Sequence, residues 1–401
     1  MVNVGVDLHK TQFTTCARTK EGEVFKMYPT LDAGYEAFLR QAALWRENGE
    51  EVRVAVESTG NTRYFKNRIE PAGIKVTVIN TLKMKVVNDS VKKTDKHDAA
   101  TIAEFLEKDM LPESQLCGRT SEQLRRYLNA RGKLVEAVTA IKNQIHSLLS
   151  GEGMEDSKAS LQSKRGRKRT LDTLHERENG LVAQPLFDTI DRLEENIKSI
   201  EGAIRTLADG DRMVELLMTI PGCGEISAWT IRAYTDDIGR FASAKKYASY
   251  AGLAPWVQNS NERIHHGSIT KRGPKELRTA LVQVVMGLRR LKAKTHIWRL
   301  MRRYERMKRT KGSGKSIIAT ARLLAVIIWH MLSEDAEFDS GKMTDQKIAK
   351  KAESMINGDA GNESMEEESL KDRQNKPVVI PRDGKIKIKS GVASKKIKKA
   401  G

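Results

Sequence analysis

Four acidic residues stand where short apolar stretches end or where a helical pattern begins. Asp7 closes the stretch VNVGVD and Glu57 closes VRVAVE, while Asp95 and Asp98 open a helical segment. A spacing of three places Asp95 and Asp98 on one face of the first helical turn. Carboxylates gathered in one place need a cation between them, and their oxygens suit Mg²⁺ or Mn²⁺. A pair of such ions serves phosphoryl transfer, so these residues predict metal-dependent phosphodiester chemistry.

Each acid also has an ordinary structural explanation when it is considered alone. Asp95 can cap its helix, and Glu57 can end a strand or pair with a lysine. The joint placement of all four acids on one order of elements favours the metal site over coincidence.

The elements that position these acids follow one another in an informative order. In chain order we expect strands at 2–7, 12–18 and 23–29, a helix at 31–48, a strand at 52–57, a helix near 61–72 and a strand at 75–80. This is the order of an RNase H-like sheet, whose first and fourth strands are parallel neighbours, so Asp7 and Glu57 emerge at the same edge. An actin-like ATPase begins in the same order, but the turn Leu8-His9-Lys10-Thr11 has no glycine for its phosphate loop.

Long helical patterns follow the predicted sheet. Helices are expected at about 96–109, 121–150 and 172–208. The helix at 121–150 has the length of a coiled-coil arm, which suggests self-association. The basic segment 157–170 between them is expected as an exposed turn that touches phosphate, with a solvated linker as the alternative. Its candidate nucleic-acid contacts are Lys164, Arg165, Arg167, Lys168 and Arg169.

A second candidate site lies in a loop-like segment from 252 to 273. Ser260 could attack a scissile phosphate if a base removed its proton, and Lys271 and Arg272 could neutralise the developing charge. From residue type alone, most loop serines make turns or caps. The pair His265 and His266 stays open between a general base, metal ligands and surface residues, since it lacks zinc-site spacing.

Two glycines precede a helical stretch at about 225–234. Gly222 and Gly224, in the sequence TIPGCG, are typical of a helix-hairpin-helix element. In such an element, glycines let backbone N–H groups approach a DNA phosphate at a helix N-terminus. A simple Pro-Gly turn between packed helices is the alternative.

Composition favours a nucleic-acid partner and argues against other classes. Lys and Arg number 71 against 52 Asp and Glu, a net charge of +19 that suits a polyanion. Three cysteines without CxxC spacing support neither a disulfide framework nor a zinc knuckle and fit a reducing cytoplasm. No signal-like N-terminus and no run of 18 apolar residues is visible, so a cytoplasmic protein that does not enter a membrane is expected.

These patterns divide the chain into four expected regions. They are an RNase H-like α/β domain at 1–115, a helical coiled-coil arm with a basic turn at 116–210, a mainly α domain with the serine loop at 211–335, and a disordered charged tail at 336–401. The tail is predicted because an acidic stretch at 358–372 precedes a lysine-rich end.

The ordered motifs resemble DEDD-type insertion-sequence transposases, which are related to the Piv DNA invertase. The resemblance covers roughly residues 2–335 and rests on GVDLHK, AVESTG, KTDKHDA, IPGCGEISA, the stretch from YAGLAP to HGSITKRG, and LRTALV. It implies a RuvC-like N-terminal domain and a C-terminal transposase domain. One departure is Asn261, which follows Ser260 where the family commonly has glycine.

The resemblance carries further expectations about mechanism and partners. It implies that Asp7, Glu57, Asp95 and Asp98 bind Mg²⁺ and that Ser260 attacks DNA to form a phosphoserine link. It also implies an active site assembled from different protomers of a dimer or tetramer. A structured bridge RNA that pairs with both donor and target DNA is expected as a guide.

Two other functions are compatible with the same residues. A RuvC-like endonuclease could hydrolyse branched DNA with water as nucleophile, in which case Ser260 would be structural. A catalytically inactive relative that only binds nucleic acid would use its acids structurally, although the intact set of four acids argues against it.

Overall fold

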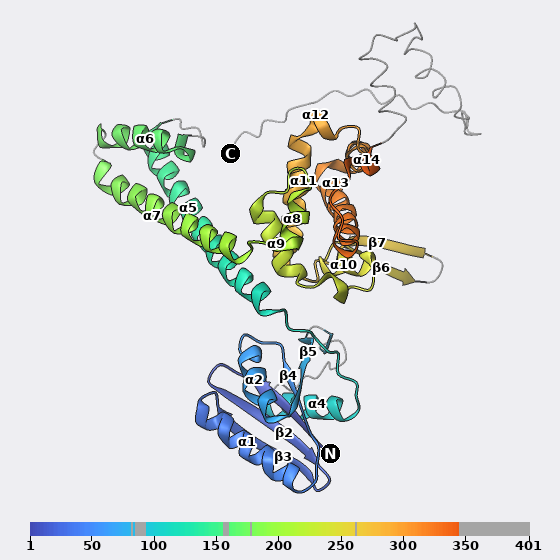
Figure 1. Cartoon of the computed structure of the whole chain (residues 1–401). Coiled ribbons are helices and arrows are strands. Elements are labelled where there is room, and N and C mark those ends of the chain that lie inside the picture. The colour runs from blue at the N-terminus through green and yellow to red at the C-terminus, as the bar shows by residue number, and fades with distance from the viewer. Residues whose placement is uncertain (82, 85–93, 155–159, 177–178, 261–262, 345–401) are drawn as a thin grey trace, which may run out of the picture.

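Residues 1–81, 83–84, 94–154, 160–176, 179–260 and 263–344 are described by the structure, a computed structural model (Figure 1). Within these ranges the chain forms three parts: an N-terminal lobe (residues 1–115), a helical arm (residues 119–207) and a C-terminal lobe (residues 212–344). The prediction of a disordered tail at 336–401 is wrong for residues 336–344, where Phe338 packs against Trp298 and a short helix forms at Ser340–Met343. From residue 345 onwards the predicted tail lies outside the described residues.

The N-terminal lobe is built on a five-stranded mixed sheet. Its strands are β1 (Val2–Leu8), β2 (Gln12–Thr19), β3 (Gly22–Pro29), β4 (Val52–Glu57) and β5 (Lys75–Ile79). The order in the sheet is β3-β2-β1-β4-β5. Strand β2 is antiparallel to both β1 and β3, and β4 is parallel to both β1 and β5. The expected strands and their order are confirmed, and the sheet is compatible with an RNase H-like fold.

Alternation along the strands gives the sheet two different faces. One face carries large apolar side chains, among them Val4 and Val6 of β1 and Val54 and Val56 of β4. They pack in a core with α1 (Asp32–Glu47) and α2 (Thr62–Ile69). Helix α2 continues into the short η1 (Glu70–Ala72). The opposite face carries small residues and packs against α4 (Asp95–Glu107). Because side chains alternate, Asp7 and Glu57 project from the face that α4 covers.

A close backbone approach holds α4 on that face. A Cβ atom on Gly5 would lie 2.1 Å from the carbonyl oxygen of Ala99 and 2.4 Å from the nitrogen of Ala103. Only glycine at this position of β1 leaves room for the helix at such a distance. The first turn of α4, with its two acids, is thereby brought to the end of β1.

The arm consists of two long helices and a short one. The helices α5 (Arg119–Gly151) and α7 (Gly180–Leu207) lie side by side, and α6 (Lys164–Glu176) packs on α7 after the short η2 (Ser160–Gln162) (Figure 1). The prediction of an exposed basic turn at 157–170 is wrong for residues 164–170, which are helical, and residues 155–159 lie outside the described ones. Likewise, the expected helix at 172–208 is divided between α6 and α7.

The C-terminal lobe is mainly helical. Its elements are α8 (Arg212–Met218), α9 (Glu225–Thr235), η3 (Ile238–Arg240), α10 (Ala244–Tyr250), β6 (Pro255–Ser260), β7 (Arg263–Ile269), α11 (Lys275–Arg290), α12 (Lys292–Thr295), α13 (Arg299–Ser333) and α14 (Ser340–Met343). The expectation of an irregular segment at 252–273 is wrong in part, because β6 and β7 pair there as an antiparallel hairpin.

Helix α13 changes character at a kink. Gly312 has φ 77° and ψ 167°, which interrupts the helix between a basic first part and an apolar second part. Among the described residues, α13 is the one helix long and apolar enough to cross a membrane by length and composition. Its apolar part, however, contributes Leu324, Ala325 and Ile328 to the core of the C-terminal lobe.

Candidate active site

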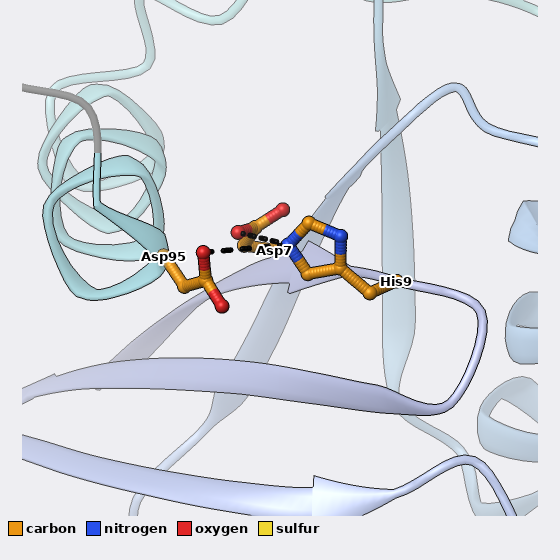
Figure 2. Close-up of side chains that lie close together, drawn as sticks. All are labelled: Asp7, His9 and Asp95. Carbon is orange, nitrogen blue, oxygen red and sulfur yellow. Dashed lines mark hydrogen bonds and ion pairs between the residues drawn. The ribbon is translucent and has the colours of Figure 1, made fainter.

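The centre of the acidic site is a contact between Asp7, His9 and Asp95. The Nε2 atom of His9 lies 3.0 Å from Oδ2 of Asp7 and 3.5 Å from Oδ1 of Asp95 (Figure 2). One ligand atom from each of the three residues lies within 4.8 Å of the others, so they are close enough to hold a metal ion. The end of β1 and the start of α4 therefore converge, as the sequence predicts.

Glu57 occupies the neighbouring strand end. The register between β1 and β4 pairs Val6 with Val56, so the next step places Glu57 beside Asp7. Both residues project from the face covered by α4, since parallel neighbours in register share a face. The strand arrangement thus supports the prediction that these two carboxylates emerge at one edge.

The first turn of α4 supplies the other two acids. The hydroxyl of Thr94 accepts a hydrogen bond from the backbone N–H of His97, so Thr94 is the N-cap of this helix. The alternative in which Asp95 caps the helix is therefore wrong. The charge of Asp98 contributes to raising the pKa of Asp7, which places it within electrostatic reach of the site.

Electrostatics indicate that the site carries an excess of negative charge. Burial raises the pKa of Asp7, and the charges of Asp95 and Asp98 add to this effect, against the opposing effect of His9. Burial lowers the pKa of His9, but the charges and hydrogen bonds of Asp7 and Asp95 outweigh it, so the pKa of His9 is raised. The imidazole of His9 thus lies between the two carboxylates and contacts both of them through Nε2.

A buried hydroxyl adds an oxygen to the same region. Thr14 on β2 pairs directly with Asp7, so the two side chains share a face of the sheet. Its Oγ1 atom is buried and makes no hydrogen bond to the residues that the structure describes. A concentration of oxygen atoms with too few donors fits a divalent cation, which supplies the missing positive charge.

His9 is the residue that sequence reasoning missed. In the sequence it stands in the turn Leu8-His9-Lys10-Thr11 and follows Asp7 by two residues. A spacing of two puts both side chains on one face of an extended chain, and this was the available signal.

Ser260 lies at the far end of the β6–β7 hairpin. It ends β6 and pairs with Arg263, while residues 261 and 262 lie outside the described part of the chain. Ser260 follows Pro255 by five residues, and Pro255 pairs with Ile269 at the other end of the hairpin, here called its base. At the rise of a β-strand, these five residues extend over ~17 Å.

The two cations proposed to assist Ser260 are not near it within one chain. Lys271 and Arg272 are exposed and follow Ile269 at the base of the hairpin. The expectation that they neutralise charge beside Ser260 is therefore wrong for a single chain. In the register of the hairpin, His265 pairs with Gln258 and His266 with Val257, so both histidines lie between its two ends.

The structure also separates the serine from the acids. Figure 1 shows the hairpin on the C-terminal lobe and the sheet on the N-terminal lobe, with no overlap between them. Within a single chain the acids and the predicted serine nucleophile therefore lie on different lobes.

The two glycines of the candidate DNA hairpin have different surroundings. A Cβ atom on Gly222, which has φ 81°, would lie 2.7 Å from the carbonyl carbon of Gly287 in α11. Gly222 therefore serves helix packing, as in the simple-turn alternative, whereas nothing lies within 4 Å of a Cβ on Gly224. Glu225 begins α9 and forms an ion pair with Arg205, which places a carboxylate where a phosphate was expected.

Arg167 differs from the other basic residues of α6. Lys164, Arg165, Lys168 and Arg169 are exposed, but Arg167 is buried. Its guanidinium donates hydrogen bonds to Asp191 at 2.9 Å and to Glu194 at 2.8 and 3.1 Å. Arg167 therefore holds α6 against α7, which leaves the other four cations as the exposed candidates for nucleic acid.

We expect Arg167→Ala to destabilise the protein by about 2–3 kcal/mol, because the carboxylates of Asp191 and Glu194 lose their shared partner. Urea denaturation measures this effect. The exposed neighbour Lys168 provides the control, since Lys168→Ala should change the free energy of unfolding by less than about 0.5 kcal/mol. Equal stability of the two variants would contradict the structural role of Arg167.

Comparisons with known proteins identify the class of protein. A model described as "Transposase", for the DEDD transposases of the IS110 type, matches residues 4–153. A second model, described as "Transposase IS116/IS110/IS902 family", matches residues 214–298. The chain belongs to the IS110 family of insertion-sequence transposases.

Individual relatives agree with this assignment. The chain is 27% identical over 354 residues to a transposase for insertion sequence element IS1111A of Coxiella burnetii, covering 84% of this chain and 91% of that protein. It is 25% identical over 300 residues to a probable family 20 transposase of Pseudomonas aeruginosa, covering 72% and 86%. A pilin gene-inverting protein of Moraxella lacunata is 26% identical over 345 residues, covering 84% and 97%.

Proposed function

We propose that this protein excises and inserts its element by Mg²⁺-dependent cleavage and rejoining of DNA strands through a phosphoserine intermediate. The observation that carries the proposal is the convergence of Asp7 and Asp95 around His9, on the lobe that matches the DEDD transposase model. Family membership supports DNA as the substrate, in the form of donor and target.

The metal would be held by Asp7, Glu57, Asp95 and Asp98. The raised pKa of Asp7 and the unpartnered Thr14 hydroxyl support a cation at this position. When bound, Mg²⁺ or Mn²⁺ would neutralise charge on the scissile phosphate and stabilise the attacking and leaving oxygens. The carboxylates fix the position of that charge, and the packing of α4 on Gly5 keeps them in place.

The serine would perform the strand exchange. Its Oγ atom loses its proton to a base and attacks phosphorus, so that a new O–P bond forms. The bond from phosphorus to the leaving DNA oxygen breaks, and that oxygen takes up a proton. Attack by a DNA hydroxyl on the phosphoserine reverses these changes, so rejoining needs no external energy source.

We further propose that acids and serine meet between protomers. Within one chain Ser260 and Asp7 belong to different lobes, and Lys271 and Arg272 follow the base of the hairpin, whereas Ser260 lies at its far end. An oligomer, a dimer or tetramer joined through the arm, would bring the hairpin of one protomer to the acids of another. The net charge of +19 supports a bridge RNA as an additional partner.

A second candidate function is a RuvC-like endonuclease that uses water. The observation that favours it is the same separation, since the acidic site stands alone in one chain. In that case Ser260 would be dispensable for cleavage.

Covalent trapping tests the proposed function. Labelled DNA with the element junction is incubated with the protein, Mg²⁺ and the RNA transcribed from the flank of the element, and protein–DNA adducts are separated under denaturing conditions. The proposal predicts a protease-sensitive adduct that requires Mg²⁺. Cleaved DNA without any adduct would support the endonuclease instead.

His9 provides a separate test of the metal site. Because its imidazole lies between Asp7 and Asp95 and Mg²⁺ prefers oxygen ligands, we expect the metal to displace it. His9→Gln should therefore show a larger rise in melting temperature than the wild type when Mg²⁺ is added. The variant His296→Gln, at an exposed histidine of the C-terminal lobe, is the control, and a smaller rise for His9→Gln would contradict displacement.

A further inference from the structure

The first part of α13 carries a dense set of cations that neither family match covers. Residues 299–315 contain eight Lys and Arg residues and one acidic residue, Glu305. The two matched segments end at residues 153 and 298, so this surface lies immediately beyond the second. Its function is not part of the acidic site or of the serine hairpin.

Five of these cations lie on one face of the helix, here called the arginine face. Its members are Arg299, Arg302, Arg303, Arg306 and Arg309. Their spacing of three and four residues aligns them along the helix, and ten residues at the helical rise extend over ~15 Å. All five are exposed. The face presents a row of guanidinium groups to solvent.

The opposite face anchors this part of α13 to the C-terminal lobe. Leu300, Met301 and Tyr304 are buried in a cluster with Trp298 and Leu288. The hydroxyl of Tyr304 lies 3.2 Å from Oγ of Ser313, across the kink at Gly312, and the guanidinium of Arg289 lies over the Tyr304 ring. The arginine face is therefore fixed on a packed helix and is not part of a flexible tail.

Three members of the arginine face have no acidic partner among the described residues. Within the described residues, Arg303, Arg306 and Arg309 have no acidic partner, and Glu305 pairs with Lys308 at 3.9 Å. A folded protein that keeps several guanidinium groups aligned and uncompensated bears a cost in repulsion, which a polyanion relieves. Arginine also binds phosphate with two parallel hydrogen bonds.

We propose that the arginine face binds the phosphate backbone of a DNA duplex. Duplex DNA carries one charge per ~1.7 Å of its axis, so a straight row of cations meets several phosphates. Recognition of single-stranded RNA depends on aromatic stacking, and the one aromatic residue of this segment, Tyr304, is buried. The inference rests on the proposed function only in that DNA is the substrate.

Binding of a DNA duplex with no element sequence tests the inference, measured by fluorescence anisotropy without Mg²⁺. The triple variant Arg303→Gln, Arg306→Gln and Arg309→Gln should bind about tenfold more weakly or worse, and its salt dependence should fall by about three counterions. Its control is Lys20→Gln, Arg40→Gln and Lys133→Gln. These three cations are exposed and each is paired with a carboxylate, so the control loses the same charge.

Equal losses in the two triple variants would overturn the inference, because net charge alone would then explain the effect. A loss confined to an RNA duplex of the same length would also overturn it and would assign the face to RNA. Since no cleavage occurs without Mg²⁺, failure of the trapping experiment would leave this result unaffected. Thermal unfolding checks that each variant is folded.

Discussion

Replacing Asp7 with Asn is expected to reduce DNA cleavage by about 10³-fold or more. The substitution removes a central charge of the metal site, and metal-ion catalysis contributes several kcal/mol to stabilisation of the transition state. Burial raises the pKa of Asp7, so its ionised form costs folding stability at neutral pH, above the ordinary pKa. Asp7→Asn should therefore not lower the melting temperature.

Cleavage of the junction DNA in a single turnover measures this effect, together with the melting temperature with and without Mg²⁺. Glu21→Gln is the matched control, because Glu21 is exposed at the turn between β2 and β3 of the same lobe. Retained cleavage in a folded Asp7→Asn variant would remove this residue from the metal site.

Replacing Ser260 with Ala is expected to eliminate the covalent adduct and to reduce strand exchange by about 10⁴-fold or more. The attacking oxygen is lost, and removal of a nucleophile has effects of at least this size in other enzymes. The control is Ser268→Ala, at an exposed serine of β7 in the same hairpin. Persistence of cleavage in Ser260→Ala would favour water as the nucleophile.

Mixing the two inactive variants tests whether a site is shared between protomers. An oligomer of Asp7→Asn and Ser260→Ala chains contains some sites with both residues intact if they come from different protomers. Cleavage should then reappear in the mixture at a fraction of the wild-type rate. A mixture as inactive as its components would show that each chain supplies both residues to one site.

The sheet and the acids were predictable because their signals are local. Strict alternation in VNVGVD and VRVAVE defines strands and places Asp7 and Glu57 at their ends. The spacing of three between Asp95 and Asp98 likewise predicts that both lie on one face of the first turn of α4. Only the element order was needed to bring these ends together, and the observed order agrees with it.

Other features depend on contacts that a linear pattern does not display. Between the basic residues of α6, the buried residues Gly166, Thr170 and Leu174 recur every four positions, which is helical spacing. These residues face the interior at the tip of the arm. Arg167 looks like its neighbours in the sequence, and only its contact with Asp191 and Glu194 on α7 distinguishes it.

The β6–β7 hairpin is a second feature that depends on contacts between segments and not on a linear pattern. The segment 255–269 looks like a loop in the sequence, because Ser260, His265 and Gly267 interrupt any apolar alternation. A Cβ on Gly267 would lie 2.0 Å from the ring of Trp256, so the indole covers the glycine across the hairpin. Contacts of this kind, made between strands, could not be read from composition.

The connection between the N-terminal lobe and the arm has a consequence for inheritance. The backbone N–H of Ser114 still bonds to Val78 of β5, and α5 begins at Arg119, so among the described residues the chain passes out of the lobe once, over residues 115–118. A crossover in the gene at this point would divide no strand pair and no helix. Recombination between related elements could therefore exchange whole lobes, and each half of such a protein could acquire its substrate preferences separately.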